Sequence, residues 1–187
     1  MTPINQKIIG VVGHPSSGKD TAAEYLVKKY GFSFISTSDM IRDYIRENDL
    51  GEPTRERMHD VVNEWRAREG GDILIRKALE KQAGRNRIVF GGIRAIAEAE
   101  AVKNNGGVMI AVTAPIETRF ARAKARGRIG DDVTFEQFKS TEDAEAKNDD
   151  PYAQNVSVII ASANYTVNNN GTHEALHKQI DQIMLSL

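Results

Sequence analysis

The sequence predicts an α/β protein in three layers, with helices on both faces of a five-stranded parallel sheet. Two observations support this prediction. Short runs rich in apolar and β-branched residues alternate with segments in which apolar residues recur at helical spacing. The first run also ends in a glycine-containing loop that leads into a helix, which makes a strand-loop-helix unit. The five candidate strands lie near residues 7–12, 32–36, 87–91, 107–113 and 164–168.

Length, charge and cysteine content limit the class of protein. At 187 residues the chain is long enough for one well-buried domain, so we expect residues 1–187 to form a single unit. With 25 Lys and Arg against 26 Asp and Glu, no net field recruits nucleic acid or an anionic membrane, and a small-molecule partner is favoured. The chain has no cysteine, no leader pattern and no membrane-length apolar run, so we expect a cytoplasmic protein. Composition leaves the oligomeric state undefined.

The loop after the first strand has the pattern of a phosphate-binding loop. Its glycines fit the spacing G-x-x-x-x-G-K, which turns backbone N–H groups inward around an anion, and Lys19 adds a positive charge. The helix that begins near Thr21 directs its N-terminal amides to the same place. An ordinary glycine-rich turn is the other interpretation. We expect the loop to bind the phosphates of a nucleotide through Gly13, His14, Pro15, Ser16, Ser17, Gly18 and Lys19.

The two residues after Lys19 depart from the usual form of this loop. Asp20 stands where a Ser or Thr hydroxyl usually meets Mg²⁺, and the hydroxyl comes one residue later, in Thr21. The sequence G-K-D-T resembles the G-K-G-T of adenylate kinases and other nucleoside monophosphate (NMP) kinases. We therefore expect Thr21 to bind Mg²⁺, directly or through water, and Asp20 to face the nucleotide and its ion.

A second resemblance to the same family lies at the end of the second strand. A Ser/Thr/Asp cluster there is a helix N-cap signal, and residues 35–42, I-S-T-S-D-M-I-R, are similar to the I-S-T-G-D-M-L-R of adenylate kinases. The similarity implies that Thr37 and Arg42 hold the acceptor nucleotide, and an arginine at the carboxyl end of a parallel strand is well placed to bind phosphate. It also makes residues 37–83 a helical acceptor-binding insertion. Four arginines of the insertion are either acceptor contacts or solvated side chains: Arg55, Arg57, Arg66 and Arg68.

The third strand enters residues 91–100, which resemble the D-G-F-P-R-T-x-x-Q-A segment of adenylate kinases. The resemblance places Arg94 at the acceptor-phosphate arginine and Glu98 at the glutamine that reads the base. A carboxylate accepts hydrogen bonds without donating them, so the preferred base would differ from adenine. Gly91 stands where the family usually has an acidic residue that orders Mg²⁺-bound water. Asp39 is then the best remaining acidic group for the metal, next to the acceptor.

After the fourth strand, three arginines share one face of the next helix: Arg119, Arg122 and Arg126. In NMP kinases the corresponding helix leads into a lid, and its arginines clamp the phosphoryl groups. The resemblance therefore assigns Arg119 and Arg122 to catalysis, and Arg119 to ATP as well. The other interpretation is an exposed basic face that is neutralised by Glu117 or by the acidic residues of 142–150.

Residues 127–150 look like the hinge, short lid and return helix of these kinases, and Thr134-x-x-Gln137 is a capping box for the return helix. Residues 156–160 are mostly apolar and fit either a helix end or a strand. Residues 163–172 resemble the closing strand and turn of dephospho-coenzyme A kinases, which makes residues 168–171 candidates for contact with the donor base.

The last helix contains the spelling H-E-x-x-H, from His173 to His177, which is the signature of zinc proteases. No third ligand is visible in the sequence, and a solvated helix face explains the pair equally well. A zinc hydrolase is therefore a minor alternative.

The resemblance to NMP kinases covers nearly the whole chain and implies a P-loop NTPase fold with a helical NMP-binding insertion and a short lid. It implies transfer of the γ-phosphoryl group of ATP to a nucleoside monophosphate, with Mg²⁺. The implied catalytic residues are Lys19, Arg94, Arg119 and Arg122, and the implied acceptor-binding residues are Thr37, Asp39, Arg42, Arg94 and Glu98. Two alternatives stay open. A dephospho-coenzyme A kinase is favoured by the closing turn, and a nucleotide-binding regulator with weak turnover is favoured by Gly91.

Overall fold

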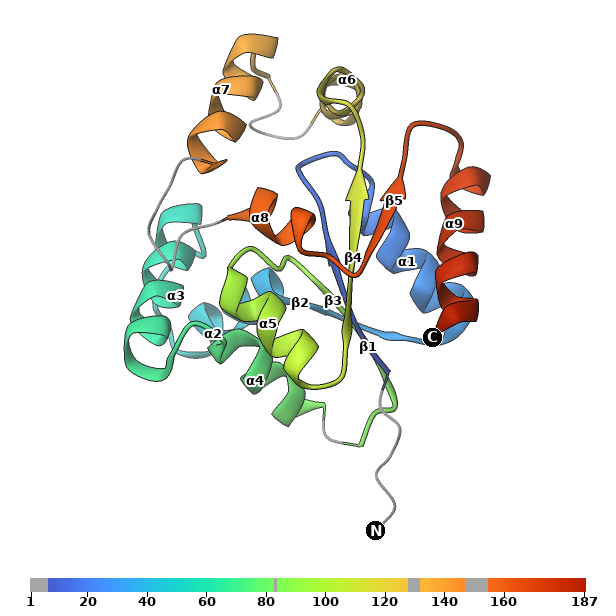
Figure 1. Ribbon diagram of the computed structural model, residues 1–187. Coiled ribbons are helices and arrows are strands. Elements are labelled where there is room, and N and C mark those ends of the chain that lie inside the picture. The colour runs from blue at the N-terminus through green and yellow to red at the C-terminus, as the bar shows by residue number, and fades with distance from the viewer. Residues whose placement is uncertain (1–6, 83, 128–131, 147–154) are drawn as a thin grey trace.

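The computed structural model describes residues 7–82, 84–127, 132–146 and 155–187, and it has the predicted three layers (Figure 1). All strands are parallel, in the order β2-β3-β1-β4-β5. The strands are β1 (Lys7–Val12), β2 (Ser33–Ser36), β3 (Arg87–Gly91), β4 (Val108–Thr113) and β5 (Tyr165–Asn168). The helices are α1 (Lys19–Tyr30), α2 (Thr37–Glu47), α3 (Arg55–Glu69), α4 (Ile73–Lys81), α5 (Ile96–Asn104), α6 (Ile116–Arg126), α7 (Phe135–Ala146), α8 (Val156–Ala161) and α9 (His173–Ser186). The predicted five-stranded α/β fold is confirmed.

Strand β1 lies at the centre of the sheet, and this position explains its sequence. Ile9 pairs with Val89 of β3 on one side and with Val108 of β4 on the other. Helices cover both faces of the sheet, so after Lys7 the strand β1 is a buried run with no alternation of polar residues. Its carboxyl end therefore opens into the loop before α1 at the middle of the sheet, between the ends of β3 and β4.

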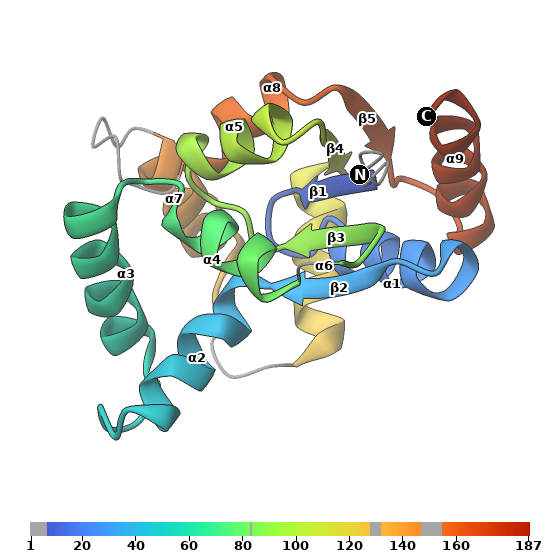
Figure 2. The ribbon, with the colours of Figure 1, turned by 90° about the horizontal axis from the view of Figure 1, so that it is seen from below.

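Each face of the sheet has its own core. Helices α1 and α9 pack on one face, and α4, α5 and α8 pack on the other (Figures 1 and 2). Because neighbouring residues of a strand point to opposite faces, Ile9 packs in the cluster of Leu26, while Ile8 packs in the cluster of Val102. The two cores hold the sheet rigid beneath the loops at its carboxyl edge.

Helices α2 and α3 and the start of α4 form a third cluster of their own. They lie in the predicted insertion, residues 37–83, of which the structure describes 37–82, and we call this segment the insertion. Figure 2 shows α3 at the opposite side of the molecule from α9. The buried apolar residues of the cluster are Ile41, Ile45, Val61, Val62, Trp65, Ile73 and Leu74. Since these contacts lie within the insertion, α3 is not part of either sheet core.

Two local predictions are answered by the helix caps. Thr134 N donates to Gln137 Oε1 at 2.8 Å and Gln137 N donates to Thr134 Oγ1 at 3.2 Å, so the predicted capping box is confirmed. Residues 156–161 form helix α8, and the Asn155 side chain accepts from Val158 N at its start. The helix interpretation of this segment is therefore the correct one.

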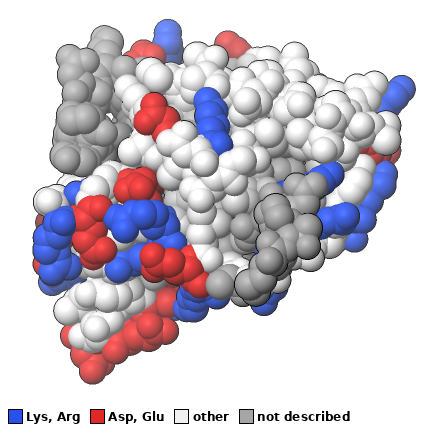
Figure 3. Space-filling model, turned by 60° about the horizontal axis from the view of Figure 1, so that its bottom comes forward, with Lys and Arg blue, Asp and Glu red and all other residues white. Residues whose placement is uncertain are grey.

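Charge is distributed without a single dominant sign on the face shown in Figure 3, where acidic and basic side chains adjoin one another at one side and the centre is uncharged. Within the described residues, none of the helices combines the length and the apolarity needed to cross a membrane.

Helices α1 and α9 are joined by a polar cluster around Asp181. Its carboxylate accepts from Lys29 Nζ at 2.8 Å, from Tyr30 Oη at 2.7 Å and from Tyr25 Oη at 2.9 Å. The hydrogen bond from Lys29, followed by those from the two tyrosines, holds the pKa of Asp181 below its usual value. The cluster thus favours the charged carboxylate in the folded state.

Asp181→Asn is expected to lower the free energy of unfolding at pH 7 by about 1 kcal/mol, since the group is 31% exposed and solvent weakens the pairing. The pKa of Asp181 is lower in the folded state than in the unfolded state, where it is about 4, so the charged carboxylate stabilises the folded protein at pH values above about 4. This stabilisation is lost as the pH falls through the folded-state pKa. Urea unfolding at pH 7 and at pH 3 measures the effect. Equal differences between wild type and variant at both pH values would contradict it, and the exposed Asp60→Asn serves as the control.

Candidate active site

The loop between β1 and α1, residues 13–18, forms a tight turn that we call the cradle. Ser16 and Gly18 have left-handed backbone conformations, with φ of 60° and 95°, and Ser17 N donates to His14 O at 3.1 Å. Gly18 is also the N-cap of α1. The turn therefore bends around a central space at the N-terminus of α1, where backbone amides favour an anion.

The two motif glycines are required by close contacts. A Cβ on Gly13 would lie 2.4 Å from Ser17 Oγ and 2.5 Å from Val112 O. A Cβ on Gly18 would lie 2.0 Å from Asn169 Nδ2. The loop is thus packed against the end of β4 on one side and against the loop after β5 on the other.

Gly18→Ala is expected to lower ATP affinity at least tenfold, because the methyl group would displace Asn169 and the loop with it. Gly31→Ala is the matched control. Gly31 ends the same helix with φ of 69° and has open space around it, so alanine there adds only the left-handed strain of about 1 to 2 kcal/mol. Calorimetric titration with ATP and thermal unfolding separate the two effects. Equal ATP affinity in both variants would contradict a packed cradle.

Two hydroxyls of the cradle fit a phosphate ligand. Ser16 Oγ and Ser17 Oγ are buried atoms that have no hydrogen-bond partner, and Ser17 is wholly buried. A buried hydroxyl without a partner is costly, and such groups are uncommon away from ligand sites. Phosphate oxygens in the cradle would supply the missing acceptors.

Lys19 and the residues after it form the first turn of α1. Lys19 Nζ lies 3.3 Å from Asp20 Oδ1, while Asp20 is largely exposed. The lysine is therefore held beside the cradle by a weak surface pair from which it can swing toward a phosphate. Thr21, the residue predicted to bind Mg²⁺, follows in the same turn of α1.

Asn169 ties the cradle to helix α6. Its amide donates to Ser17 O at 2.8 Å, and its backbone carbonyl accepts from Arg122 Nη2 at 2.9 Å. Asn169 is 5% exposed. Asn169 is one of the residues 168–171 predicted as candidates for contact with the donor base. In the structure it contacts the cradle and Arg122, and so it positions both.

Arg119 is buried and already holds a carboxylate. Its Nη1 and Nη2 donate to the two oxygens of Glu142 at 2.5 and 2.8 Å, and its Nε donates to Ala114 O. Glu142 Oε1 also lies 3.7 Å from His14 Nδ1 of the cradle. In this conformation Glu142 of α7 thus sits between the cradle and Arg119, where a phosphoryl group would compete with it. The sequence allowed that acidic residues of 142–150 neutralise the arginines of α6. For Arg119 this is the case, because it pairs with Glu142.

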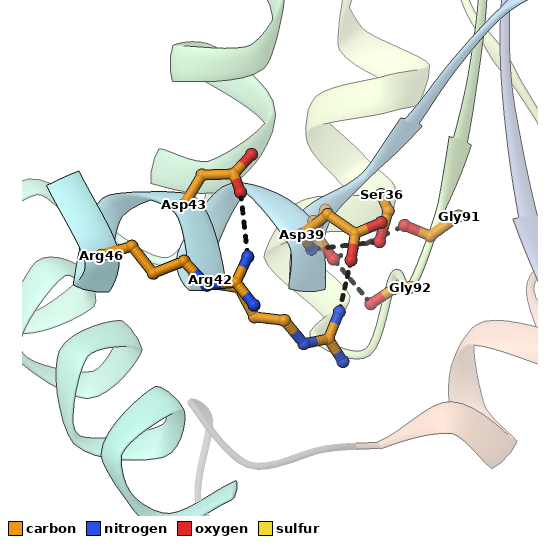
Figure 4. Close-up of polar contacts among 8 residues, drawn as sticks. Ser36, Asp39, Arg42, Asp43, Arg46, Gly91 and Gly92 are labelled. Carbon is orange, nitrogen blue, oxygen red and sulfur yellow. Dashed lines mark hydrogen bonds and ion pairs between the residues drawn. The ribbon is translucent and has the colours of Figure 1, made fainter. Parts of the chain in front are cut away.

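The predicted acceptor residues of α2 lie at the carboxyl end of β2 (Figure 4). Arg42 pairs with Asp39 one turn earlier, and both side chains are exposed. Ser36 Oγ accepts from Asp39 N at 3.1 Å and so caps the helix. Thr37 is buried and donates to Gly92 O at 3.0 Å, so its hydroxyl positions the loop after β3.

Gly91, which stands where the resemblance to adenylate kinases predicts an acidic residue, lies under the ring of Phe34. A Cβ on Gly91 would lie 2.8 Å from two ring carbons of Phe34. Phe34 is 48% exposed, so it could move aside, but as placed it occupies the position of a side chain at residue 91. Position 91 therefore supplies no carboxylate, and Asp39 is the labelled acidic residue nearest to it in Figure 4.

Glu98 does not face the open site. It is 1% exposed, and its carboxylate accepts from Arg66 Nη2 and from the backbone N–H groups of Arg94 and Ala95. Its predicted role as the base reader would require these bonds to break. Arg66, which the sequence suggested was either solvated or an acceptor contact, is instead buried against Glu98.

The described part of the chain has no group of three His, Cys, Asp or Glu side chains that could hold a metal ion. Of the two histidines in H-E-x-x-H, His177 stacks on Tyr25 with 3.7 Å between the ring centroids. The ring centroid of His173 lies 6.3 Å from that of His177. The predicted hinge residues 128–131 and the acidic residues 147–150 lie outside the described residues.

Comparison with known proteins shows the family to which this chain belongs. Residues 9–148 match the AAA domain family AAA_18. A UPF0200 protein of Methanosarcina barkeri is 30% identical over 95% of this chain and 94% of its own length. The chain therefore belongs to the AAA domain family and to the UPF0200 proteins. A UPF0200/UPF0201 protein of Archaeoglobus fulgidus is 32% identical over 98% of this chain, which spans 57% of that protein's length.

The fold of this UPF0200 chain is that of P-loop kinases. Shikimate kinase from Bacteroides thetaiotaomicron superimposes with a TM-score of 0.59 and 17% identity, over 96% of this chain and 98% of that one. The segment that matches the family model, residues 9–148, begins within β1. It therefore includes the cradle, the arginines of the insertion and of α6, and helix α7.

Proposed function

We propose that the chain is a phosphotransferase that moves the γ-phosphoryl group of ATP to a nucleoside monophosphate. The observation that carries this proposal is the cradle, which leads into the N-terminus of α1 and contains two buried serine hydroxyls without hydrogen-bond partners. Arg119 is linked to the same loop through Glu142, which lies near His14. Arg122 is linked to it through Asn169, which donates to Ser17 O.

On the donor side, the loop amides and Lys19 bind the phosphates, and Thr21 holds Mg²⁺, which neutralises charge on the terminal phosphates. Arg119 has the planar fork that binds phosphoryl oxygens in pairs, and it now makes this kind of contact with Glu142. Catalysis by such a site is mostly positioning and charge neutralisation, because the transferred group needs little covalent help.

On the acceptor side, Arg42 and Arg94 lie beyond the carboxyl ends of β2 and β3. Arg94 is exposed, and the side chain of Arg42 is 40% exposed. Arg42 would exchange its surface pair with Asp39 for the acceptor phosphate, which leaves Asp39 free to order water around Mg²⁺. A phosphate oxygen is already a nucleophile near neutral pH, so this acceptor requires no general base.

A second candidate is a nucleotide-binding regulator with weak turnover, favoured by the absence of a carboxylate at Gly91. The experiment that separates the two is the release of ADP from Mg·ATP in the presence of a panel of acceptors: AMP, GMP, CMP, UMP, dTMP and dephospho-coenzyme A. We expect one nucleoside monophosphate to speed ADP release and to appear as its diphosphate. Tight ATP binding with no acceleration by any acceptor would favour the regulator, and acceleration by dephospho-coenzyme A alone would move the acceptor to that class.

A further inference from the structure

Arg66 and Glu98 form an ion pair inside the protein, between α3 of the insertion and the first turn of α5. Arg66 Nη2 lies 2.7 Å from Glu98 Oε1, and the two side chains are 7% and 1% exposed. Charges are buried at this depth only when they are paired, and the loss of one partner leaves the other uncompensated. The contact therefore joins two segments that are 32 residues apart in the sequence.

The second oxygen of Glu98 holds the loop that carries Arg94. Oε2 accepts from Arg94 N at 2.9 Å and from Ala95 N at 3.2 Å. The Arg94 carbonyl accepts from Asn155 N at 2.9 Å, so both sides of this residue's backbone are fixed while its side chain is exposed. One carboxylate thus binds α3 with one oxygen and positions Arg94 with the other.

We propose that Glu98 is a positioning residue that couples the insertion to Arg94. This inference rests on the proposed function, since it takes Arg94 as an acceptor contact. The apolar residues of α3 pack in the insertion's own cluster, apart from both sheet cores. A shift of α3 when the acceptor binds therefore reaches the Arg94 loop through Arg66 and Glu98. Thr37, which donates to Gly92 O, links α2 to the same loop.

Glu98→Gln tests the coupling with little change of shape. The amide has one oxygen acceptor in place of two, so it cannot satisfy Arg66 and the backbone amides together. We expect amide hydrogen exchange, measured residue by residue by NMR, to quicken at least tenfold both at Arg94 and Ala95 and along α3. Exchange in β1 and α1 should stay unchanged.

Arg68→Met is the matched control. Arg68 lies on the same helix, is 57% exposed and pairs with Glu64 on the surface, so its loss should leave exchange at Arg94 and Ala95 unchanged. Arg66→Met with Glu98→Gln removes both charges and keeps the test open if Glu98→Gln alone does not fold. The double variant should again free α3 and the Arg94 loop together.

Exchange that quickens equally throughout the chain, or that leaves Arg94 and Ala95 as protected as in wild type, would overturn the coupling. In transfer assays, Glu98→Gln should raise the KM for the acceptor about tenfold or more and leave the KM for ATP within twofold. If the wild type transfers nothing to any acceptor, the proposed function fails, while the exchange result still decides the coupling.

Discussion

Lys19→Ala is expected to slow phosphoryl transfer by about 10²- to 10³-fold, as is typical when one preorganised positive or hydrogen-bonding group is removed from a transition state. Lys19 begins α1 at the edge of the cradle, and its ammonium is held beside it by the exposed Asp20. On ATP binding this charge would meet the terminal phosphates. The side chain is not part of either core, so the variant should keep its melting temperature within about 2 °C, the shift expected for a change well below 1 kcal/mol.

Lys28→Ala is the control for this variant. Lys28 lies in the last turn of the same helix, is 77% exposed and pairs only weakly with Glu24. Steady-state rates for both variants, measured with the acceptor identified from the panel, test the donor site. Wild-type turnover in Lys19→Ala would show that the phosphates bind elsewhere.

Arg119→Met is expected to reduce turnover by about 10³-fold or more, because a clamping arginine neutralises charge that develops in transfer. The methionine retains most of the buried stem, so packing changes little. Lys124→Met on the same helix, where the ammonium meets Asp132 at the surface, is the control and should keep wild-type turnover.

Glu142→Gln should act in the opposite direction on ATP binding. Its carboxylate now occupies the fork of Arg119, and a neutral amide competes less with a phosphoryl group. We expect ATP affinity to rise several-fold while stability falls by about 1 to 2 kcal/mol, since Arg119 loses a charged partner in the free protein. Lower ATP affinity in both Arg119→Met and Glu142→Gln would show that the pair is only a scaffold for α7.

Local signals predicted most of the fold. The strand, the glycine loop and the following helix lie within residues 7–30, and β3 and β4 are short apolar runs followed by helices. β5 contains polar residues, and it was expected from the resemblance of residues 163–172 to the closing strand of dephospho-coenzyme A kinases. Residues 156–160 were ambiguous because a short, mostly apolar run fits a strand or a helix equally well. The Asn155 side chain decides the matter as an N-cap, and this signal was present in the sequence.

The partners of the site residues could not be predicted in the same way, because they are far apart in the sequence. Glu98 sits at a position that suggested base reading, and only the folded chain brings Arg66 to it. One local sign was available: Arg66 follows Val62 by one helical turn and adjoins Trp65, and both are buried. Glu142 likewise was one of several acidic residues in 142–150 that could neutralise the arginines of α6. Only the folded chain shows that it is Glu142 that reaches Arg119, across 23 residues.

The most direct test of the site is an NMR titration of the wild-type chain with Mg·ATP, followed through the backbone amides. One molecule of ATP per chain should bind, with the largest shifts at residues 13–21 and a smaller response at Arg119 and Arg122. Shifts confined to other residues, or no binding at millimolar ATP, would contradict a polyphosphate site between β1 and α1.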